Sequence, residues 1–230
     1  MAIAIERNSP PVRSGTFGPQ WDLGDEEIAE LTDVIRAGKL GRLGGTKVVQ
    51  FEKEFAAQVG VKYAQAVTSG TAAVHTAVGV IDPNPGDEII TTSITDFGTV
   101  IGILYQNAVP VFADIDPVTG NLDVNDVAAK ITERTKAIVL VHLFGNPGDL
   151  TPLIELARAH NLVVIEDCAQ SQLAEYKGRP VGSWGDIGCF SFGGKHMTTG
   201  DGGMVVTNRD DLSDRLKWFT DKGNPRQPVY

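Results

Sequence analysis

One lysine of this 230-residue chain stands in a setting that suits covalent chemistry. Lys195 lies between Ser191 and a glycine-rich turn, near the end of the sequence. Upstream, the apolar run Leu162–Ile165 leads directly into the carboxylates Glu166 and Asp167. An amine that forms an imine with an aldehyde, and a carboxylate that keeps a pyridine nitrogen protonated, are the two groups that pyridoxal phosphate (PLP) requires. The pattern therefore predicts a PLP site.

A second segment is suited to hold the phosphate of such a cofactor. Thr68, Ser69, Gly70 and Thr71 follow a short predicted strand and open a helix of small residues. Free backbone N–H groups, the helix dipole and the hydroxyls would together form a phosphate cradle. An ordinary Ser/Thr helix cap explains the same residues, and it is the candidate lysine that favours the phosphate interpretation.

The neighbouring residues also carry two interpretations each. Glu166 and Asp167 alternate along a strand, so their side chains should point to opposite faces of the sheet. Gln170 is either a contact to the cofactor ring or its phenolic oxygen, or a plain polar residue of the loop. The apolar neighbours of Lys195 predict a buried segment, in which a desolvated amine is a competent nucleophile. His196 is adjacent to Lys195, so its side chain should point away.

Composition and charge argue against several other classes of protein. The formal net charge of -9, with no basic block, argues against nucleic acid or an anionic membrane as a partner. No apolar run has transmembrane length, and Cys168 and Cys189 are typical of core thiols in a reducing compartment, so we expect a cytoplasmic protein. No His, Cys or carboxylate pair has metal-ligand spacing. No G-x-G-x-x-G follows a strand, which disfavours a nicotinamide site.

Strands and helices alternate along most of the chain. Strands are predicted at Lys62–Val67, Glu88–Thr91, Val109–Ala113, Ala137–Val141, Leu162–Ile165, Ile187–Phe192 and Met204–Thr207. Helices are predicted at Glu26–Ala37 with Asp25 as cap, from the cap Thr46 to Val59, and at Thr71–Val80, Thr99–Gln106 and Val124–Ile131. A further helix is predicted to run to His160, with Thr151 as its capping residue and Pro152 in its first turn. This order predicts a three-layer α/β/α fold with a mostly parallel sheet. Residues 1–20 are predicted to form an N-terminal arm, and residues 21–230 one large domain.

Three distinctive loops follow predicted strands. They are Thr68–Thr71, Asp167–Gln170 and the Lys195 region. Ligands of open α/β sheets bind outside the carboxyl ends of the strands. We therefore expect the three loops to converge at one edge of the sheet.

Ordered segments along nearly the whole chain resemble one protein family. They are G-x-L-G-G-T-K-V-V-Q-F-E-K-E-F-A at Gly41–Ala56, T-S-G-T-A-A at Thr68–Ala73, P-G-D-E-I-I at Pro85–Ile90, P-V-F-A-D-I-D at Pro110–Asp116, T-K-A-I-V-L-V-H-L-F-G at Thr135–Gly145, I-E-D-C-A-Q at Ile165–Gln170 and the Lys195 segment. They are similar to the DegT/DnrJ/EryC1/StrS family of PLP-dependent aminotransferases, which act on keto-sugars and aminocyclitols. So many matches in order are a specific signal.

The resemblance implies a fold, an activity and a set of site residues. The fold is the large domain of the aspartate-aminotransferase-like type I PLP-dependent transferases, normally a homodimer with active sites at the subunit interface. The activity is transfer of an amino group from glutamate or glutamine to a keto-sugar, expected to be nucleotide-linked, or to an aminocyclitol precursor. Lys195 and Asp167 would be the catalytic pair. The implied cofactor contacts are Gly70, Thr71, Asp167, Gln170, Ser191 and Lys195.

The chain departs from the family pattern at three points. Many members have an aromatic residue stacked on the cofactor ring where this chain has Asp96, which makes Asp96 a candidate ring contact. Ser191 and Lys195 are one residue closer together than is usual. The sequence ends at Tyr230, before the family's smaller C-terminal domain, which normally supplies substrate contacts. We therefore expect the chain alone to be poorly active.

Two alternative functions stay open at this point. A PLP-dependent sugar dehydratase of the same family would replace the imine lysine by histidine; Lys195 argues against it, although His196 is adjacent. A non-catalytic regulator or sensor that kept the fold would suit Asp96 and the missing domain. Retention of both Lys195 and Asp167 argues against that role.

Overall fold

A computed structural model describes residues 22–223 of the chain. It divides the chain into two compact units, residues 1–47 and residues 48–230, each of which is described by itself. The first contains helix α1 (Asp25–Ala37), which ends where Gly38 takes a left-handed backbone with φ 65° and donates to the Ile35 carbonyl. The predicted arm, residues 1–20, lies outside the described residues, and the domain division at residue 21 stays a prediction.

A seven-stranded sheet forms the centre of the second unit. In spatial order its strands are β1 (Tyr63–Val67), β9 (Gly203–Thr207), β8 (Ile187–Ser191), β5 (Val163–Asp167), β4 (Thr135–Val141), β2 (Glu88–Thr92) and β3 (Val109–Ala113). Strand β9 is antiparallel to both of its neighbours, and every other pairing is parallel. The mostly parallel sheet expected from the strand–helix alternation is confirmed. Strands β6 (Glu175–Tyr176) and β7 (Arg179–Pro180) form a separate hairpin.

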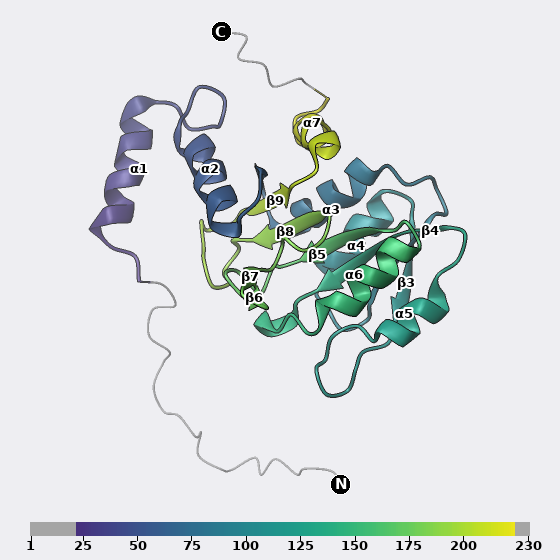
Figure 1. Ribbon diagram of the computed structural model, residues 1–230. Coiled ribbons are helices and arrows are strands. Elements are labelled where there is room, and N and C mark those ends of the chain that lie inside the picture. Colours follow the sequence, from purple (N-terminus) through teal and green to yellow (C-terminus); the bar gives the residue numbers. More distant parts are fainter. Residues whose placement is uncertain (1–21, 224–230) are drawn as a thin grey trace, which may run out of the picture. The chain divides into compact units, whose positions relative to one another are not determined.

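Helices cover both faces of this sheet (Figure 1). One face is covered by α3 (Gly70–Ile81), α4 (Phe97–Tyr105) and α7 (Asp210–Thr220). The other is covered by α5 (Val124–Lys130), α6 (Leu150–Ala159) and α2 (Lys47–Val59). The predicted three-layer arrangement is therefore confirmed. No helix within residues 22–223 is long and apolar enough to cross a membrane.

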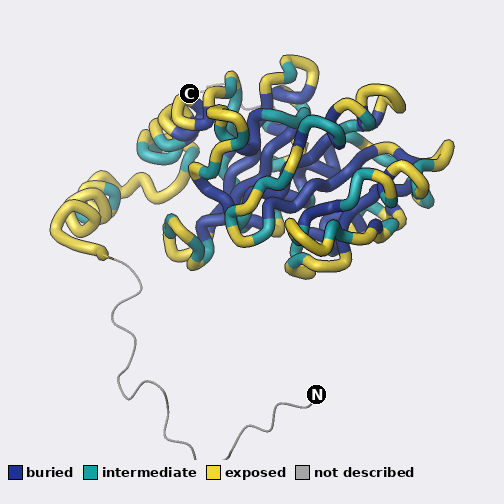
Figure 2. Tube along the Cα trace, turned by 60° about the horizontal axis from the view of Figure 1, so that its bottom comes forward, coloured by how far each residue is buried: buried dark blue, intermediate teal, exposed yellow. Residues whose placement is uncertain are grey.

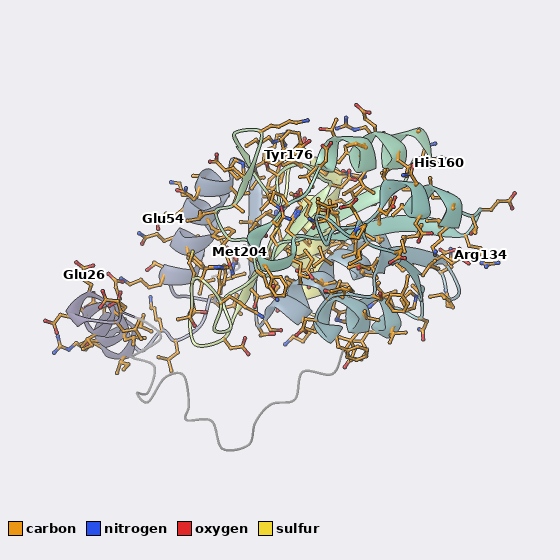
Figure 3. All side chains as sticks on the ribbon, turned by 90° about the horizontal axis from the view of Figure 1, so that it is seen from below. Glu26, Glu54, Arg134, His160, Tyr176 and Met204 are labelled. Atoms are coloured by element: carbon orange, nitrogen blue, oxygen red, sulfur yellow. The ribbon has the colours of Figure 1, made fainter. Side chains whose placement is uncertain are left out.

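The core lies between the sheet and its two helical layers. Strands β2, β8 and β9 are buried along their whole length, and Figure 2 shows the sheet as the most buried part of the unit. In Figure 3, Met204 of β9 lies inside the unit, whereas Arg134 and His160, which precede β4 and β5, lie at its edge. Strands that are covered on both faces consist of nearly continuous apolar residues, so their positions could be predicted well from the sequence.

Short polar side chains cap the N-termini of the helices that follow the strands. The Ser69 hydroxyl accepts from Ala72 N at 3.0 Å, and Asp96 Oδ1 accepts from Gly98 N at 2.7 Å. Such bonds satisfy N–H groups that have no acceptor within the helix itself. Helices α3 and α4 therefore start within a few residues of the ends of β1 and β2.

Two predicted helix caps are wrong by one or two residues. Helix α1 begins at Asp25, and Gly24 occupies the cap position that was predicted for Asp25. Helix α6 begins at Leu150, with Asp149 rather than Thr151 as its capping residue. In α6 the carboxylate displaces the hydroxyl because Asp149 lies far enough upstream for its Oδ1 to meet Thr151 N, at 3.4 Å.

Helix α7 and the β6–β7 hairpin are absent from the sequence prediction. The buried residues Leu212 and Leu216 of α7 have the i, i+4 spacing that could have revealed the helix. The hairpin strands are two residues each, too short for any periodic signal.

A buried carboxylate ties the end of β5 to the loop before β8. Glu166 is fully buried, and its Oε1 accepts from Trp184 N at 2.7 Å and Gly185 N at 2.6 Å. Its Oε2 accepts from Gly182 N at 2.8 Å and lies 3.0 Å from His142 Nε2. Four partners fill the acceptor sites of one carboxylate, so Glu166 serves the fold.

We expect Glu166→Gln to lower the free energy of unfolding by about 3 kcal/mol, because either orientation of the amide turns an NH₂ group toward backbone N–H donors. Urea unfolding monitored by circular dichroism measures the change. Glu155→Gln, at an exposed position of α6, is the matched control and should alter stability little. Equal effects of the two substitutions would show that the Glu166 bonds contribute nothing specific.

Candidate active site

The register of the sheet brings the three predicted loops to one edge. Gly203, the first residue of the antiparallel strand β9, pairs with Val67 at the end of β1 and with Ser191 at the end of β8. Asp167, at the end of β5, pairs with Cys189 of β8. Strands β1, β5 and β8 therefore end side by side, and the loops that follow them meet.

These loops line a pocket of about 270 Å³. The residues singled out from the sequence all contribute to its wall: Gly70, Thr71, Asp96, Asp167, Gln170, Ser191 and Lys195. Thr95, Thr99, His142 and Asp201 also line it and were not among the predicted site residues. Within the described part of the chain, no Phe, Tyr or Trp lines the pocket.

The start of α3 and the end of β8 touch at Gly70. A Cβ atom on Gly70 would lie 2.5 Å from Ser191 Cβ and 2.9 Å from Ser191 Oγ, so only glycine fits there. The Ser191 hydroxyl is thereby held beside the first N–H groups of α3. Ser69 caps the helix through Ala72 N, which leaves the N–H groups of Gly70 and Thr71 without an intrahelical acceptor. Ser69 can thus cap α3 while the N–H groups of Gly70 and Thr71 stay available, so the two interpretations of this segment are compatible.

A second close contact joins α4 to the same corner. A Cβ on Gly98, in the first turn of α4, would lie 2.6 Å from Thr71 Oγ1. The absence of a side chain at Gly98 lets the start of α4 approach the start of α3. This approach brings Asp96 and Thr99 to the pocket wall.

Asp167 presents a buried carboxylate to the pocket. It is 5% exposed, and it accepts from Thr99 Oγ1 at 2.7 Å and from Ala169 N at 3.0 Å. Burial raises the pKa of Asp167, while the bonds from Thr99 and Ala169 offset part of that rise. The nearby carboxylate of Asp96 adds to the rise in pKa. A cationic partner in the pocket would therefore favour the charged form of Asp167.

Two threonines support this carboxylate. The hydroxyls of Thr95 and Thr99 lie 2.7 Å apart. Thr99 has one hydroxyl proton and gives it to Asp167, so Thr95 must donate to Thr99. The spacing of four residues across the start of α4 was the only sequence signal for this pair, and it is a weak one.

The amide of Gln170 is oriented by the turn after β4. Its Oε1 accepts from Phe144 N at 3.1 Å. Phe144 has φ 55°, a left-handed conformation that is unusual for a bulky residue and often marks a functional turn. Since the oxygen is engaged, the NH₂ group is the donor that Gln170 brings to the pocket.

The loop that carries Lys195 is less buried than the sequence predicted. Phe192 is buried and Met197 is half-buried against the same apolar cluster, but Gly194 and His196 are exposed. Lys195 itself is half-buried at the pocket wall. The prediction of a buried segment holds for the flanking apolar side chains, which turn inward, but it is wrong for the tip of the loop, which stays at the surface.

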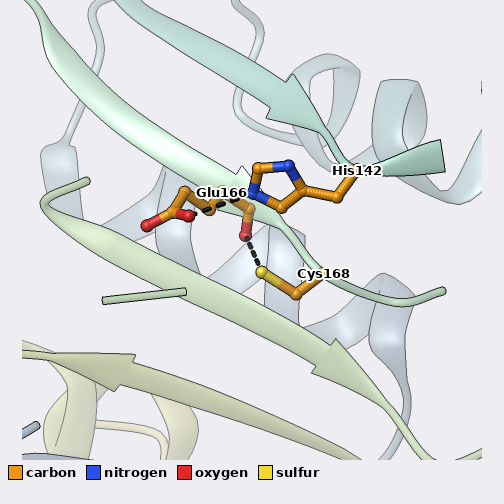
Figure 4. Close-up of side chains that lie close together, drawn as sticks. All are labelled: His142, Glu166 and Cys168. Carbon is orange, nitrogen blue, oxygen red and sulfur yellow. Dashed lines mark hydrogen bonds and ion pairs between the residues drawn. The ribbon is translucent and has the colours of Figure 1, made fainter. Parts of the chain in front are cut away.

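Three side chains of metal-ligand type gather next to this site. His142, Glu166 and Cys168 have ligand atoms within 4.8 Å of one another (Figure 4). Both oxygens of Glu166 already have two hydrogen-bonding partners each. Burial, followed by the nearby Glu166 and Asp167 carboxylates, raises the pKa of Cys168 well above its ordinary value, whereas metals bind the thiolate. The cluster is therefore better suited to supporting the ends of β4 and β5 than to holding an ion.

Comparison with known proteins gives consistent results. The chain matches the model of the DegT/DnrJ/EryC1/StrS aminotransferase family over residues 22–229. It is 42% identical over 213 residues to GDP-perosamine synthase of Caulobacter vibrioides, an alignment that covers 92% of this chain and 56% of that protein. The chain thus spans little more than half the length of this relative.

Solved structures share the fold. The aminotransferase from Psychrobacter cryohalolentis is 41% identical with a TM-score of 0.90, over 94% of this chain and 55% of that one. NtdA from Bacillus subtilis, solved with the bound cofactor PMP, is 29% identical with a TM-score of 0.78, over 85% of this chain and 45% of that one. From this extent of similarity we conclude that the chain belongs to the DegT/DnrJ/EryC1/StrS aminotransferase family.

Proposed function

We propose that this chain provides the PLP-binding part of an aminotransferase that passes an amino group to a keto-sugar. One observation carries the proposal: Lys195 and Asp167, from segments far apart in sequence, line the same pocket. Family membership supports amino transfer, and the presence of Lys195 favours it over the dehydratase alternative.

The pocket has the donor set that PLP needs. Ser191 Oγ and the N–H groups of Gly70 and Thr71 would hold the phosphate, at a contact so close that a Cβ on Gly70 would fill it. Asp167, buried and with a raised pKa, would hold the pyridinium N–H. The Gln170 NH₂ group would donate to the phenolic oxygen. The residues present therefore fit the cofactor.

Two side chains would carry the chemistry. Bound PLP supplies an electron sink that stabilises negative charge at the reacting carbon. The Lys195 amine would attach the cofactor covalently and, once freed by the amino substrate, would hold and move the proton at its Nζ. Asp167 would keep the pyridine nitrogen protonated throughout. Asp96 stays a candidate ring contact, although its Oδ1 is engaged by Gly98 N.

Similarity supports a substrate class. The match to a GDP-perosamine synthase favours a nucleotide-linked keto-sugar as acceptor, with glutamate or glutamine as donor. Assembly as a homodimer and a cytoplasmic location stay predictions.

We expect PLP added to the purified protein to give an absorbance band near the visible edge, and Lys195→Ala to abolish it. The band should fade when glutamate or glutamine is added, since the amino donor releases the lysine. Lys136→Ala, at an exposed position on β4, is the control and should keep the band. Persistence of the band in Lys195→Ala would refute the assignment of the lysine.

We expect Asp167→Asn to stabilise the free protein and to weaken its binding of PLP. In the free protein at pH 7 it should raise the melting temperature by roughly 2–4 °C, because it removes a buried charge. The amide oxygen can still accept from Ala169 N, and the NH₂ group can donate to the Thr99 hydroxyl, which then donates to Thr95. The affinity for PLP should fall at least about tenfold, because the charged partner of the pyridinium is lost. Thermal melts with and without PLP measure both effects, and exposed Asp214→Asn is the control.

The stability that Asp167→Asn gains over wild type depends on pH, because the pKa of Asp167 is raised in the folded protein. A carboxyl whose pKa is higher in the folded state contributes stability below its ordinary value of 3.8, and loses it as pH rises through the folded pKa. The advantage of Asp167→Asn over wild type should therefore shrink as pH falls toward 3.8. A variant less stable than wild type at pH 7 would mean that the bonds from Thr99 and Ala169 outweigh the cost of burial.

We expect Gly70→Ala to weaken binding of PLP more than binding of pyridoxal, which lacks the phosphate. The added Cβ would displace Ser191 from the start of α3 and cost about 1–3 kcal/mol of stability. Fluorescence titration with the two ligands measures the preference. Gly41→Ala is the control, because a Cβ there meets nothing within 4 Å. An unchanged preference for PLP would remove Gly70 from the phosphate cradle.

A further inference from the structure

Gln172 is a buried side chain that joins three separate segments of the pocket wall. It is 8% exposed. Its Nε2 donates to the carbonyls of Ala169, at 3.2 Å, and of Ser191. Its Oε1 lies 3.0 Å from Nδ1 of His196. No other side chain of the described residues bonds to all three segments.

The chemistry of the amide fixes each donor and acceptor in this network. Both partners of Nε2 are carbonyl oxygens, so that end of Gln172 must be the NH₂ group. Oε1 is then an acceptor, and His196 Nδ1 must carry the proton between them. Nδ1 keeps that proton whether the imidazole is neutral or charged, so the bond does not depend on ionisation of His196.

The three partners are neighbours of the proposed cofactor contacts. Ser191 belongs to the phosphate cradle, Ala169 lies between Asp167 and Gln170, and His196 is next to Lys195. The loop that carries Lys195 is closed at its base by backbone bonds from Phe192 N to Gly202 O at 2.8 Å and from Thr199 N to Phe192 O at 3.2 Å. For residues 194–197, the His196–Gln172 bond is the one side-chain hydrogen bond that the described structure contains.

We propose that Gln172, acting through His196, is a positioning residue that holds the Lys195 loop against the pocket. This role rests on the proposed function of Lys195 but concerns the loop itself. Gly194 precedes Lys195 with φ 68°, and glycine changes between left-handed and right-handed backbone at little cost, so the backbone at this position does little to fix the loop. The amide ties it to two carbonyls that already border the site. His196, exposed and therefore dispensable for the core, acts as a tether rather than as an acid or base.

Trypsin digestion of the cofactor-free protein tests the tether directly, because trypsin cleaves after Lys195 only when the loop opens. We expect His196→Ala to speed cleavage at this bond roughly tenfold, the effect of losing one stabilising hydrogen bond on an opening equilibrium. Gln172→Ala should speed it at least as much, because it also loses the bonds to the carbonyls of Ala169 and Ser191. Mass spectrometry of the first fragments measures the rate at Lys195. Cleavage after Lys177, in the exposed turn between β6 and β7, is the internal standard and should not change.

His196→Asn is the conservative variant, since its Nδ2 is attached to Cγ as Nδ1 is in histidine and can donate to the same Oε1. It should restore the wild-type cleavage rate. His160→Ala, an exposed histidine after α6, is the matched control. The double variant Gln172→Ala/His196→Ala should be cleaved no faster than the quicker single variant, because both lose the same bond. Wild-type cleavage in His196→Ala, or failure of His196→Asn to restore it, would overturn the proposal.

Titration with PLP separates this inference from the proposed function. We expect His196→Ala to weaken PLP binding about fivefold to tenfold, by making the Lys195 amine less well placed, while His196→Asn binds as wild type does. If neither the wild-type protein nor any variant binds PLP, the proposed function fails, while the trypsin cleavage rates still decide whether Gln172 and His196 hold the loop. If PLP binds all variants equally, the tether has no part in positioning Lys195 and the inference fails alone.

Discussion

The site is organised around a carboxylate that the fold keeps away from water. Asp167 ends the central strand β5 and is 5% exposed. Among residues 22–223, its hydrogen-bond donors are one threonine hydroxyl and one backbone N–H. Burial raises its pKa, because the two hydrogen bonds do not fully replace the water that stabilises a charged carboxylate at the surface. The folded protein thus carries an electrostatic cost at this position, of the kind that active sites retain because a cationic ligand can relieve it. The neighbouring elements are arranged to hold this group at the pocket wall.

Two adjacent carboxylates show how environment divides structural from functional roles. Glu166 and Asp167 follow one another on β5 and point to opposite faces. Glu166 receives three backbone N–H bonds and faces His142, so its acceptors are fully used and it joins β5 to the loop before β8. Asp167 keeps acceptor capacity on the pocket side. The number of hydrogen-bond donors around each carboxylate, rather than its residue type, distinguishes Glu166 from Asp167.

The pocket wall is assembled from many small close contacts. Glycine at position 70 admits Ser191 to the start of α3, and glycine at position 98 admits Thr71 to the start of α4. Gln172 then connects the end of β8, the Asp167–Gln170 loop and the Lys195 loop through one amide. Close contacts of this kind restrict the positions of the side chains that line the pocket, as a preorganised site requires.

Apart from the β6–β7 hairpin and helix α7, the order of strands and helices could be predicted from the sequence. The loops that follow the strands and the types of side chain that they carry could be predicted as well. Buried parallel strands are continuous apolar runs, and Lys195, Asp167 and the Thr68–Thr71 segment stand out by type and spacing. Helix caps were misplaced by one or two residues because several neighbouring polar side chains can each cap. The burial of the Lys195 loop, the support of Asp167 by Thr95 and Thr99, and the role of Gln172 depend on contacts between segments that lie far apart in sequence. Such contacts leave no local periodicity, so only the folded structure decides them.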